Sequence, residues 1–357
     1  MGQALRSGGA NTLSNSFCSF TFILKISASI YSNKTKSLRE LVQELDAVNI
    51  DYIHIDSNNE LGVFNDIEQI RPISNAKIDL HIISPEPEKF FDGIRKTNTE
   101  YVTFQYEDLK TTFDVPSDIS SKLGLAIVSN TPVDVFENYK NRFDFILFMT
   151  TTPGQSGGAF SKETFQKIRE FKKKYPDKTI HVDGGVTDEV AFVLRNMGVF
   201  LVVSGSYLVN PYDTIGSAVQ RLRSDRGSSH ILMSDFMITK KETPIVGPDA
   251  SFLKVLQNIE SYNFGFTSVV DHDGKLIGIV SNADVRRGLI KNMQQFDKIG
   301  VNELINKAPY KIKSTNNVSE MLNFIRNIKT TILFLPVVDD DNVLQGVVTF
   351  NNLIKNE

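Results

Sequence analysis

Cysteine is nearly absent from this chain, which has one, Cys18, among 357 residues. A single cysteine excludes an intramolecular disulfide and a metal site built from several cysteines. This scarcity is typical of a reducing compartment, and we expect a cytoplasmic location. Histidine is also rare, with five in the chain, so histidines at equivalent positions of neighbouring strands are informative.

The chain also lacks long apolar runs and a strong excess of one charge. No apolar run reaches the roughly 18–20 residues that a membrane-spanning helix needs. The formal net charge of -3 gives no reason to expect nucleic acid or an acidic membrane surface as a partner. Residues 1–22 are rich in Gly, Ser and Asn and lack the pattern of a secretion signal, so we expect a flexible N-terminal extension.

From residue 24 to residue 222, strand-like segments alternate with helix-like ones, and Ser37 and Glu40 have capping-box spacing. Eight such units predict an α/β fold, a closed (β/α)8 TIM barrel. The alternative is a doubly wound open sheet, but residues 29–33 lack the glycine fingerprint of that fold, and we favour the barrel. The predicted strands are 24–30, 51–56, 77–83, 101–106, 123–128, 143–149, 179–183 and 200–204, and the predicted helices are 37–45, 65–70, 87–96, 116–122, 132–139, 162–175, 188–197 and 213–222.

Polar side chains end three of these strands, where a barrel carries its active site. His54 and Asp56 end the second predicted strand, His81 ends the third and Asp183 ends the seventh. Two imidazoles and two carboxylates that converge on the barrel axis suit Zn, Mn or Fe(II). The alternative is that the histidines are hydrogen-bonded barrel residues without a metal.

Glycine-bearing loops follow the sixth, seventh and eighth strands. Glycine exposes backbone N–H groups and lets an anion approach closely. The loops after strands seven and eight are the common phosphate site of this fold, so we predict a phosphorylated ligand. The residues are Gly157, Gly158, Gly184, Gly185, Gly205 and Ser206.

Residues 24–222 resemble the ribulose-phosphate 3-epimerase family, and we place this epimerase-like barrel at 23–224. The resemblance implies that His54, Asp56, His81 and Asp183 hold a metal. It also implies that the two aspartates act as acid and base on opposite faces of C3 of a ketose phosphate, through an enediolate. Ser29 would contact the substrate, and the glycine loops with Ser206 would bind its phosphate. The motifs are Lys25-Ile-Ser-Ala-Ser-Ile30, His54-Ile-Asp56, Asp79-Leu-His81, Met149 followed by Pro153-Gly154 and Gly157-Gly158, Asp183-Gly-Gly185, and Gly205-Ser206.

The lining departs from the family's usual pattern at several positions. Residues 57–60 read Ser-Asn-Asn-Glu in place of Val-Met-Asp-Gly, and Gln105 stands where strand four usually has a histidine. We therefore expect a metal-dependent 3-epimerase for a ketose phosphate, of the ribulose-5-phosphate/xylulose-5-phosphate type or a related hexulose or heptulose phosphate. Two alternatives stay open: a non-catalytic sugar-phosphate or nucleotide sensor, and a phosphate-binding barrel enzyme without a metal.

An internal repeat with an offset of 68 residues begins near residue 228. Val269-Val-Asp271 matches Val337-Val-Asp339, Gly278 matches Gly346, and residues 271–274 and 339–342 are predicted hairpin turns. The repeat resembles a tandem pair of cystathionine-beta-synthase (CBS) domains, a smaller α+β (Bateman) module. We place the copies at 231–292 and 299–357, after a short polar linker.

The resemblance to CBS pairs implies a cleft for an adenine nucleotide. Ser281 would lie near phosphate, Asp284 on the ribose hydroxyls, and Arg286 and Arg287 are available for phosphate. In the second copy Asn352 replaces the aspartate, so we expect at most one strong nucleotide site. The alternative is a module for dimerisation only. Because CBS pairs and barrel epimerases both associate, we expect a homo-oligomer.

Overall fold

The structure is a computed structural model that describes residues 24–110, 113–155, 157–224, 230–292, 299–328 and 332–349. The predicted extension 1–22, Cys18 and Asn352 lie outside these residues. Among the helices of the described residues, none combines the length and the apolar character needed to cross a membrane.

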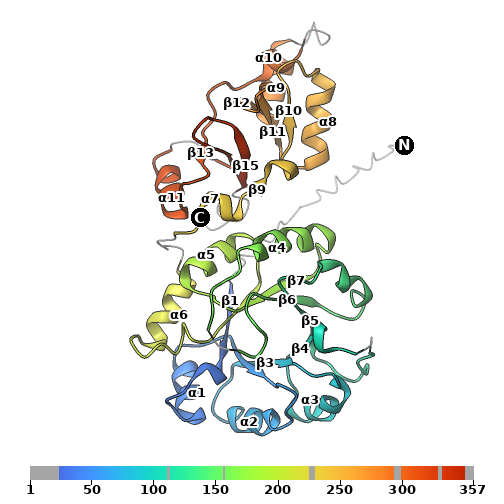
Figure 1. The fold of residues 1–357 in the computed structure, drawn as a ribbon, viewed down its shortest axis with the longest axis vertical. Helices are drawn as coiled ribbons and strands as arrows, with labels where there is room; N and C mark the ends of the chain where they lie inside the picture. The colour runs from blue at the N-terminus through green and yellow to red at the C-terminus, as the bar shows by residue number, and fades with distance from the viewer. Residues whose placement is uncertain are drawn as a thin grey trace, which may run out of the picture.

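Eight parallel strands close into a barrel, as predicted, and the closure excludes the open sheet. Each strand pairs with the next, and β8 pairs with β1 from Lys25↔Leu201 to Ala28↔Ser204. Helices surround the strands (Figure 1). The strands are β1 (Lys25–Ser29), β2 (Tyr52–Asp56), β3 (Lys77–Ile82), β4 (Tyr101–Gln105), β5 (Lys122–Val128), β6 (Phe145–Met149), β7 (Thr179–Asp183) and β8 (Leu201–Ser204).

The barrel helices follow the predicted order, and α1 begins with the predicted capping box between Ser37 and Glu40. The α-helices are α1 (Leu38–Ala47), α2 (Val63–Ile70), α3 (Phe91–Thr97), α4 (Glu163–Lys174), α5 (Asp188–Asn196) and α6 (Ile215–Arg223). The 3-10 helices are η1 (Ile30–Ser32), η2 (Pro87–Phe90), η3 (Tyr106–Asp108) and η4 (Val133–Asn138).

Two predicted helices differ in the structure. Residues 116–122 contain a turn and the start of β5, since a single bond from the Ile119 N–H to the Pro116 carbonyl closes there. Residues 132–139 form the 3-10 helix η4, in which Val133 and Phe136 are buried. Their spacing of three residues matches the 3-10 period.

Strand alternation separates the two faces of the barrel wall. On β2, Ile53 and Ile55 belong to the large apolar cluster that includes the surrounding helices. His54 and Asp56 point into the barrel, because successive side chains of a strand alternate between its faces. The β2–β3 register places Asp56 beside His81.

Aromatic rings fill the lower interior of the barrel. Phe145 stacks on His181 with ring centroids 4.0 Å apart, and the Phe200 ring centroid lies 5.6 Å from that of the same imidazole. Gly124 on β5 leaves the space for the Phe145 ring, because a Cβ there would lie 2.1 Å from Phe145 Cε2. These packed rings close the barrel interior below the C-terminal ends of the strands.

Residues 230–349 form a second module of two sheets, and the predicted hairpins are present. The two hairpins have the same register after a shift of 68 residues, with Phe266↔Ser281 in one and Phe334↔Thr349 in the other. The sheets are β10-β11-β12 and β13-β14-β15-β9. The elements are α7 (Met233–Phe236), β9 (Ile238–Thr239), η5 (Lys240–Glu242), β10 (Ile245–Val246), α8 (Phe252–Tyr262), β11 (Phe266–Val270), β12 (Leu276–Ser281), α9 (Asn282–Lys291), α10 (Val301–Leu304), β13 (Ile312–Lys313), α11 (Val318–Arg326), β14 (Phe334–Val338) and β15 (Leu344–Thr349).

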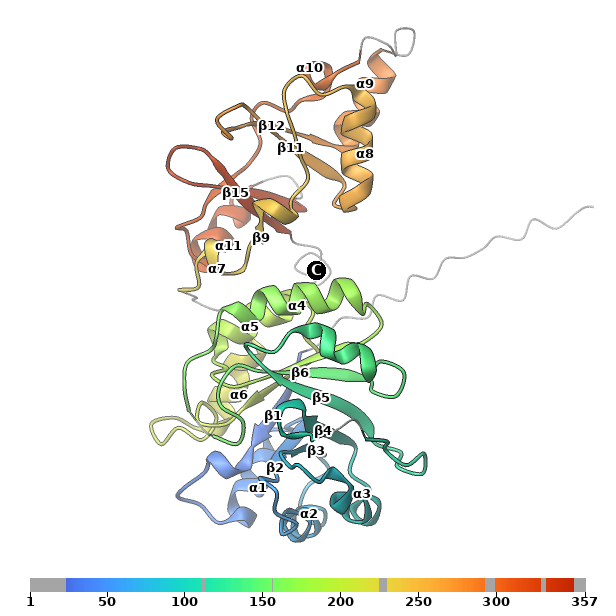
Figure 2. The same ribbon diagram turned by 45° about the vertical axis from the view of Figure 1, so that its right-hand side comes forward.

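The two CBS copies pack against each other through equivalent residues and through an exchanged strand. Phe266 stacks on its repeat counterpart Phe334 with centroids 3.7 Å apart. Strand β9, which precedes the first copy's own sheet, pairs with β15 of the second copy. Figure 2 shows this module above α4 and α5 of the barrel.

Gly124→Ala should destabilise the barrel by about 1–3 kcal/mol, because the added methyl overlaps the Phe145 ring that stacks on His181. Chemical denaturation followed by far-UV circular dichroism measures this change. The matched control is Gly62→Ala, where a Cβ meets nothing within 4 Å. We expect that control to change stability by less than about 0.5 kcal/mol. Equal stability of both variants would contradict the packing.

Candidate active site

Four side chains from three strands meet at the rim of the barrel. They are the predicted set, His54 and Asp56 on β2, His81 on β3 and Asp183 on β7. One ligand atom from each lies within 4.8 Å of the others. His54 Nε2 is 3.3 Å from Asp56 Oδ1 and 3.8 Å from Asp183 Oδ2, and His81 Nδ1 is 3.1 Å from Asp56 Oδ1.

The cluster fits a divalent metal by the chemistry of its donors. Two imidazole nitrogens and two carboxylates form a mixed set of nitrogen and oxygen ligands. This set suits Zn, Mn and Fe(II) better than Mg or Ca, which prefer oxygen ligands. Both histidines are buried, while the carboxylates are partly accessible from the rim. A metal held here would therefore be fixed from below and open toward a ligand from above.

Each histidine has a buried partner on its other ring nitrogen. Asp79 Oδ2 lies 2.9 Å from His54 Nδ1 and also accepts from the Ser27 hydroxyl at 2.9 Å. Gln105 Oε1 lies 2.9 Å from His81 Nε2. Such partners orient an imidazole and select its tautomer. Neither Asp79 nor Gln105 was predicted to act at the site, although strand alternation places Asp79 on the same face as His81.

The electrostatics of the metal-free cluster separate the two carboxylates. Burial raises the pKa of Asp183 to about 6, and nearby Asp56 adds to the shift. Burial also opposes ionisation of Asp56, but the neighbouring His54 and His81 outweigh it and hold the pKa of Asp56 well below its usual range. Burial likewise disfavours a charged His54, yet Asp79 and Asp56 raise the pKa of His54 well above its ordinary value.

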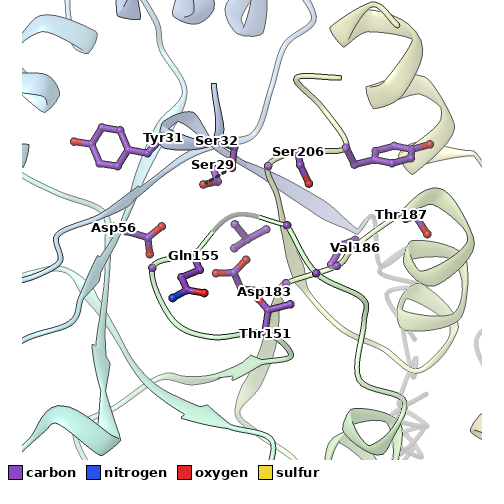
Figure 3. Close-up of a pocket in the computed structure, with 18 residues that line it drawn as sticks. Ser29, Tyr31, Ser32, Asp56, Thr151, Gln155, Asp183, Val186, Thr187 and Ser206 are labelled. Carbon is purple, nitrogen blue, oxygen red and sulfur yellow. Dashed lines mark hydrogen bonds between the residues drawn. The ribbon is translucent and has the colours of Figure 1, made fainter. Parts of the chain in front are cut away.

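A pocket of about 250 Å³ opens directly above the two aspartates. Figure 3 shows Asp56 and Asp183 in the same hollow as Ser29 and Ser206. Every predicted substrate or phosphate residue lines this pocket: Ser29, Gly157, Gly158, Gly184, Gly185, Gly205 and Ser206. Other polar lining residues were not predicted, because η1 and the loops that carry them have no recognisable sequence pattern: Tyr31, Ser32, Thr151, Gln155, Thr187 and Tyr207.

Two glycines of the pocket are required by close packing. Gly185 has φ +60°, and a Cβ there would lie 2.3 Å from the Phe160 backbone nitrogen. A Cβ on Gly205 would lie 2.0 Å from Ser32 Oγ. These close approaches bring the loops after β6, β7 and β8 together around one small volume, which is the arrangement expected for an anion held by backbone N–H groups.

The predicted nucleotide residues of the second module have local partners in the structure. Ser281 and Asp284 form a capping box at the start of α9, and Arg287 pairs with the Asp284 carboxylate at 2.5 Å. Arg286 is exposed. The second copy's Thr349 borders an apolar cavity of about 420 Å³, which Ile168 of the barrel also lines.

The model of the "Ribulose-phosphate 3 epimerase family" matches residues 25–209, and the CBS domain model matches residues 233–291 and 301–357. The chain is 27% identical to ribulose-phosphate 3-epimerase of Bacillus subtilis over 219 residues, covering 57% of this chain and all of that one. It is 30% identical to the enzyme of the same name from Candida glabrata over 171 residues, covering 46% of this chain and 69% of that one.

A solved CBS-pair protein, CBSX2 from Arabidopsis thaliana, overlaps 36% of this chain and 94% of its own, with 23% identity and a TM-score of 0.31. The family model, rather than this overlap, defines the second module. Since the first model covers more than half of the chain and the barrel holds its expected elements in order, the chain belongs to the ribulose-phosphate 3-epimerase family, whose members are isomerases acting on carbohydrates, and it carries two CBS domains after its barrel.

Proposed function

We propose that this protein is a metal-dependent 3-epimerase of a ketose phosphate. The observation that supports this most is the position of two carboxylates with separated pKa values, lowered for Asp56 and raised for Asp183, on one His/Asp cluster beneath a glycine-lined pocket. Epimerisation needs a proton removed from one face of a carbon and returned to the other. Two carboxylates whose environments push their pKa values apart can divide these tasks.

His54, Asp56, His81 and Asp183 would hold the metal, which would offset the negative charge that develops on the sugar oxygens. Asp56, the more acidic of the two, accepts the proton from C3 of the substrate, and Asp183, which takes up a proton more readily, returns one from the opposite face. In the reverse direction the two residues exchange roles. Ser29, Ser206 and the backbone of Gly185 and Gly205 bind and orient the phosphorylated end.

The substrate belongs to the ketose phosphates, with ribulose 5-phosphate and xylulose 5-phosphate as the first pair to test. The departures from the family pattern at 57–60 lie directly after Asp56, where Ser57 Oγ accepts from the Ile83 N–H and Asn59 Oδ1 accepts from the Ser84 hydroxyl at 2.7 Å. Because the loop after β2 differs from the family pattern, hexulose and heptulose phosphates belong in the substrate panel.

We infer that the CBS pair binds an adenine nucleotide and adjusts the barrel through α4. Asp235 of α7 pairs with Lys162 at 2.6 Å, just before α4. Phe236 of α7 contacts Phe165 of α4, with centroids 6.4 Å apart, and Phe165 contacts Phe160 at 4.9 Å. Phe160 is the residue whose backbone packs against Gly185 in the pocket. These contacts connect the CBS module to the phosphate loop. A role in dimerisation alone is the second candidate.

The first prediction concerns the reaction. Metal-loaded protein in D2O should incorporate deuterium at C3 of at least one ketose phosphate of the panel, with Mn or Zn added. Asp56→Asn and Asp183→Asn should each slow epimerisation by at least about 100-fold, because each removes a proton-transfer group. The control Asp144→Asn, at the opposite end of the barrel, should retain activity. Absence of exchange on every sugar would refute the epimerase and favour the sensor.

The second prediction concerns stability of metal-free protein. The Asp183 pKa rises from 3.8 to about 6, so the folded state resists ionisation and loses stability as pH rises through this window. The shift of about two units corresponds to about 3 kcal/mol. Asp183→Asn should therefore stabilise the chelator-treated protein by up to that amount above pH 6 and by little below pH 4. Denaturant titrations at several pH values measure this. The exposed control Asp134→Asn should lack this pH dependence, and a pH-independent effect of Asp183→Asn would contradict the assignment.

The third prediction concerns the nucleotide. Calorimetry with AMP, ADP and ATP should detect binding, and Arg286→Ala should weaken it by about tenfold, since a charged contact to phosphate is lost. Arg39→Ala, an exposed arginine on α1, is the control. Phe236→Ala should leave nucleotide affinity unchanged but remove the effect of the nucleotide on the exchange rate. Absence of binding for all three nucleotides would leave dimerisation as the role of the module.

A further inference from the structure

Gln105 and Glu107 form a chain of hydrogen bonds that runs from the exposed Glu107 through the buried Gln105 to His81. Gln105, the last residue of β4, is fully buried, and its Oε1 lies 2.9 Å from His81 Nε2. The Gln105 amide nitrogen donates to Glu107 in η3. Glu107 in turn accepts from the Val128 N–H at 3.1 Å and from the Thr131 hydroxyl. The carboxylate is thus held in place by the end of β5 and the loop after it.

The direction of these bonds determines where the His81 proton sits. An ionised carboxylate only accepts hydrogen bonds, so Glu107 requires the amide nitrogen of Gln105 to face it. The amide oxygen then faces His81, and an oxygen of this kind only accepts. His81 Nε2 therefore carries a proton, and Nδ1 is the ring nitrogen that faces Asp56 Oδ1 at 3.1 Å. A nitrogen and a carboxylate oxygen at this distance can share a proton, or can both bind a metal that displaces this proton.

We propose that Gln105 and Glu107 are positioning residues that set the tautomer of His81, so that Nδ1 is the atom it offers to the metal. This inference rests on the proposed function in that it assumes His81 is a metal ligand. It also gives the departure from the family pattern at position 105 a physical meaning. A histidine that donates one N–H to Glu107 presents its other nitrogen as an acceptor to His81, as Gln105 Oε1 does. Glutamine thus preserves the same relay, by which we mean the hydrogen-bond chain from Glu107 through residue 105 to His81.

Glu107→Gln tests the relay because it changes one oxygen for an NH2 group of the same shape. The new amide can donate to Gln105 Oε1 and release the Gln105 amide to rotate. Its NH2 group would then donate to His81 Nε2 and leave the proton on Nδ1. We expect affinity for Zn and for Mn, measured by chelator competition, to fall by about 10–100-fold.

A second readout uses the metal-free protein and does not depend on activity. Long-range 1H–15N NMR of histidine-labelled protein distinguishes protonated from unprotonated ring nitrogens. The wild type should show His81 Nε2 protonated, whether or not Nδ1 shares a proton with Asp56, and Glu107→Gln should show Nε2 unprotonated. Gln105→His should keep the wild-type tautomer and metal affinity within about threefold. The matched control is Glu100→Gln, because Glu100 likewise accepts from a backbone N–H, that of Ile78, but at the opposite end of the barrel.

The outcomes separate this inference from the proposed function. If wild-type protein binds metal and Glu107→Gln matches it in affinity and tautomer, the relay is wrong while the metal site stands. If wild-type protein binds no metal, the proposed function fails, and the tautomer of metal-free wild-type His81 still decides the relay. A wild-type His81 with Nε2 unprotonated would overturn it. Should Glu107→Gln not fold, Gln105→Leu removes the acceptor and should weaken metal binding as well.

Discussion

Closure of the eight parallel strands is the constraint on which the candidate active site depends. His54 and Asp183 are far apart in the sequence, and they become neighbours because β8 pairs with β1 and bends the sheet into a ring. All strands then end at one rim, so inward-facing residues at those ends converge. The same closure brings three glycine-bearing loops around the pocket above them. In an open sheet these groups would lie along an edge instead of around an axis.

The cost of this convergence is electrostatic. His54 lies within reach of three carboxylates, those of Asp56, Asp79 and Asp183, in the interior of the barrel. Charges removed from water destabilise a fold unless they are paired or coordinate a metal. The metal-free cluster responds by dividing its protons unequally, with Asp183 protonated more readily than Asp56. The features that make the cluster costly to fold are therefore those that suit it to metal binding and proton transfer.

The CBS pair is a different solution to the burial of small sheets. One copy supplies short strands with a limited apolar face, and the second copy covers that face through the Phe266–Phe334 stack and the exchange of β9. The pair then contacts the barrel through α7, which lies next to α4. Because α4 follows a glycine-bearing loop that lines the pocket, this contact falls next to an element that leads into the candidate site.

The sequence alone determined the repeating units and the residue types of the site. Period-two alternation placed His54 and Asp56 on one face of their strand, and the 68-residue offset predicted both hairpin turns. The predictions of two short helices were wrong, because these segments depend on packing. Residues 116–122 contain a turn and the start of β5, and residues 132–139 form a 3-10 helix. Local propensity does not resolve such short segments, because few local hydrogen bonds distinguish the alternatives.

Only the tertiary structure decided how the site residues are partnered. Nothing in the sequence around Asp79, Gln105 or Glu107 shows that they lie behind His54 and His81, because these contacts join different strands of the barrel. The same holds for the separated pKa values of Asp56 and Asp183, which arise from burial and from neighbours on other strands. Sequence patterns specify which face of a strand a side chain occupies. The distances between side chains on different strands depend on how the strands are assembled. The protonation of those side chains depends on these distances.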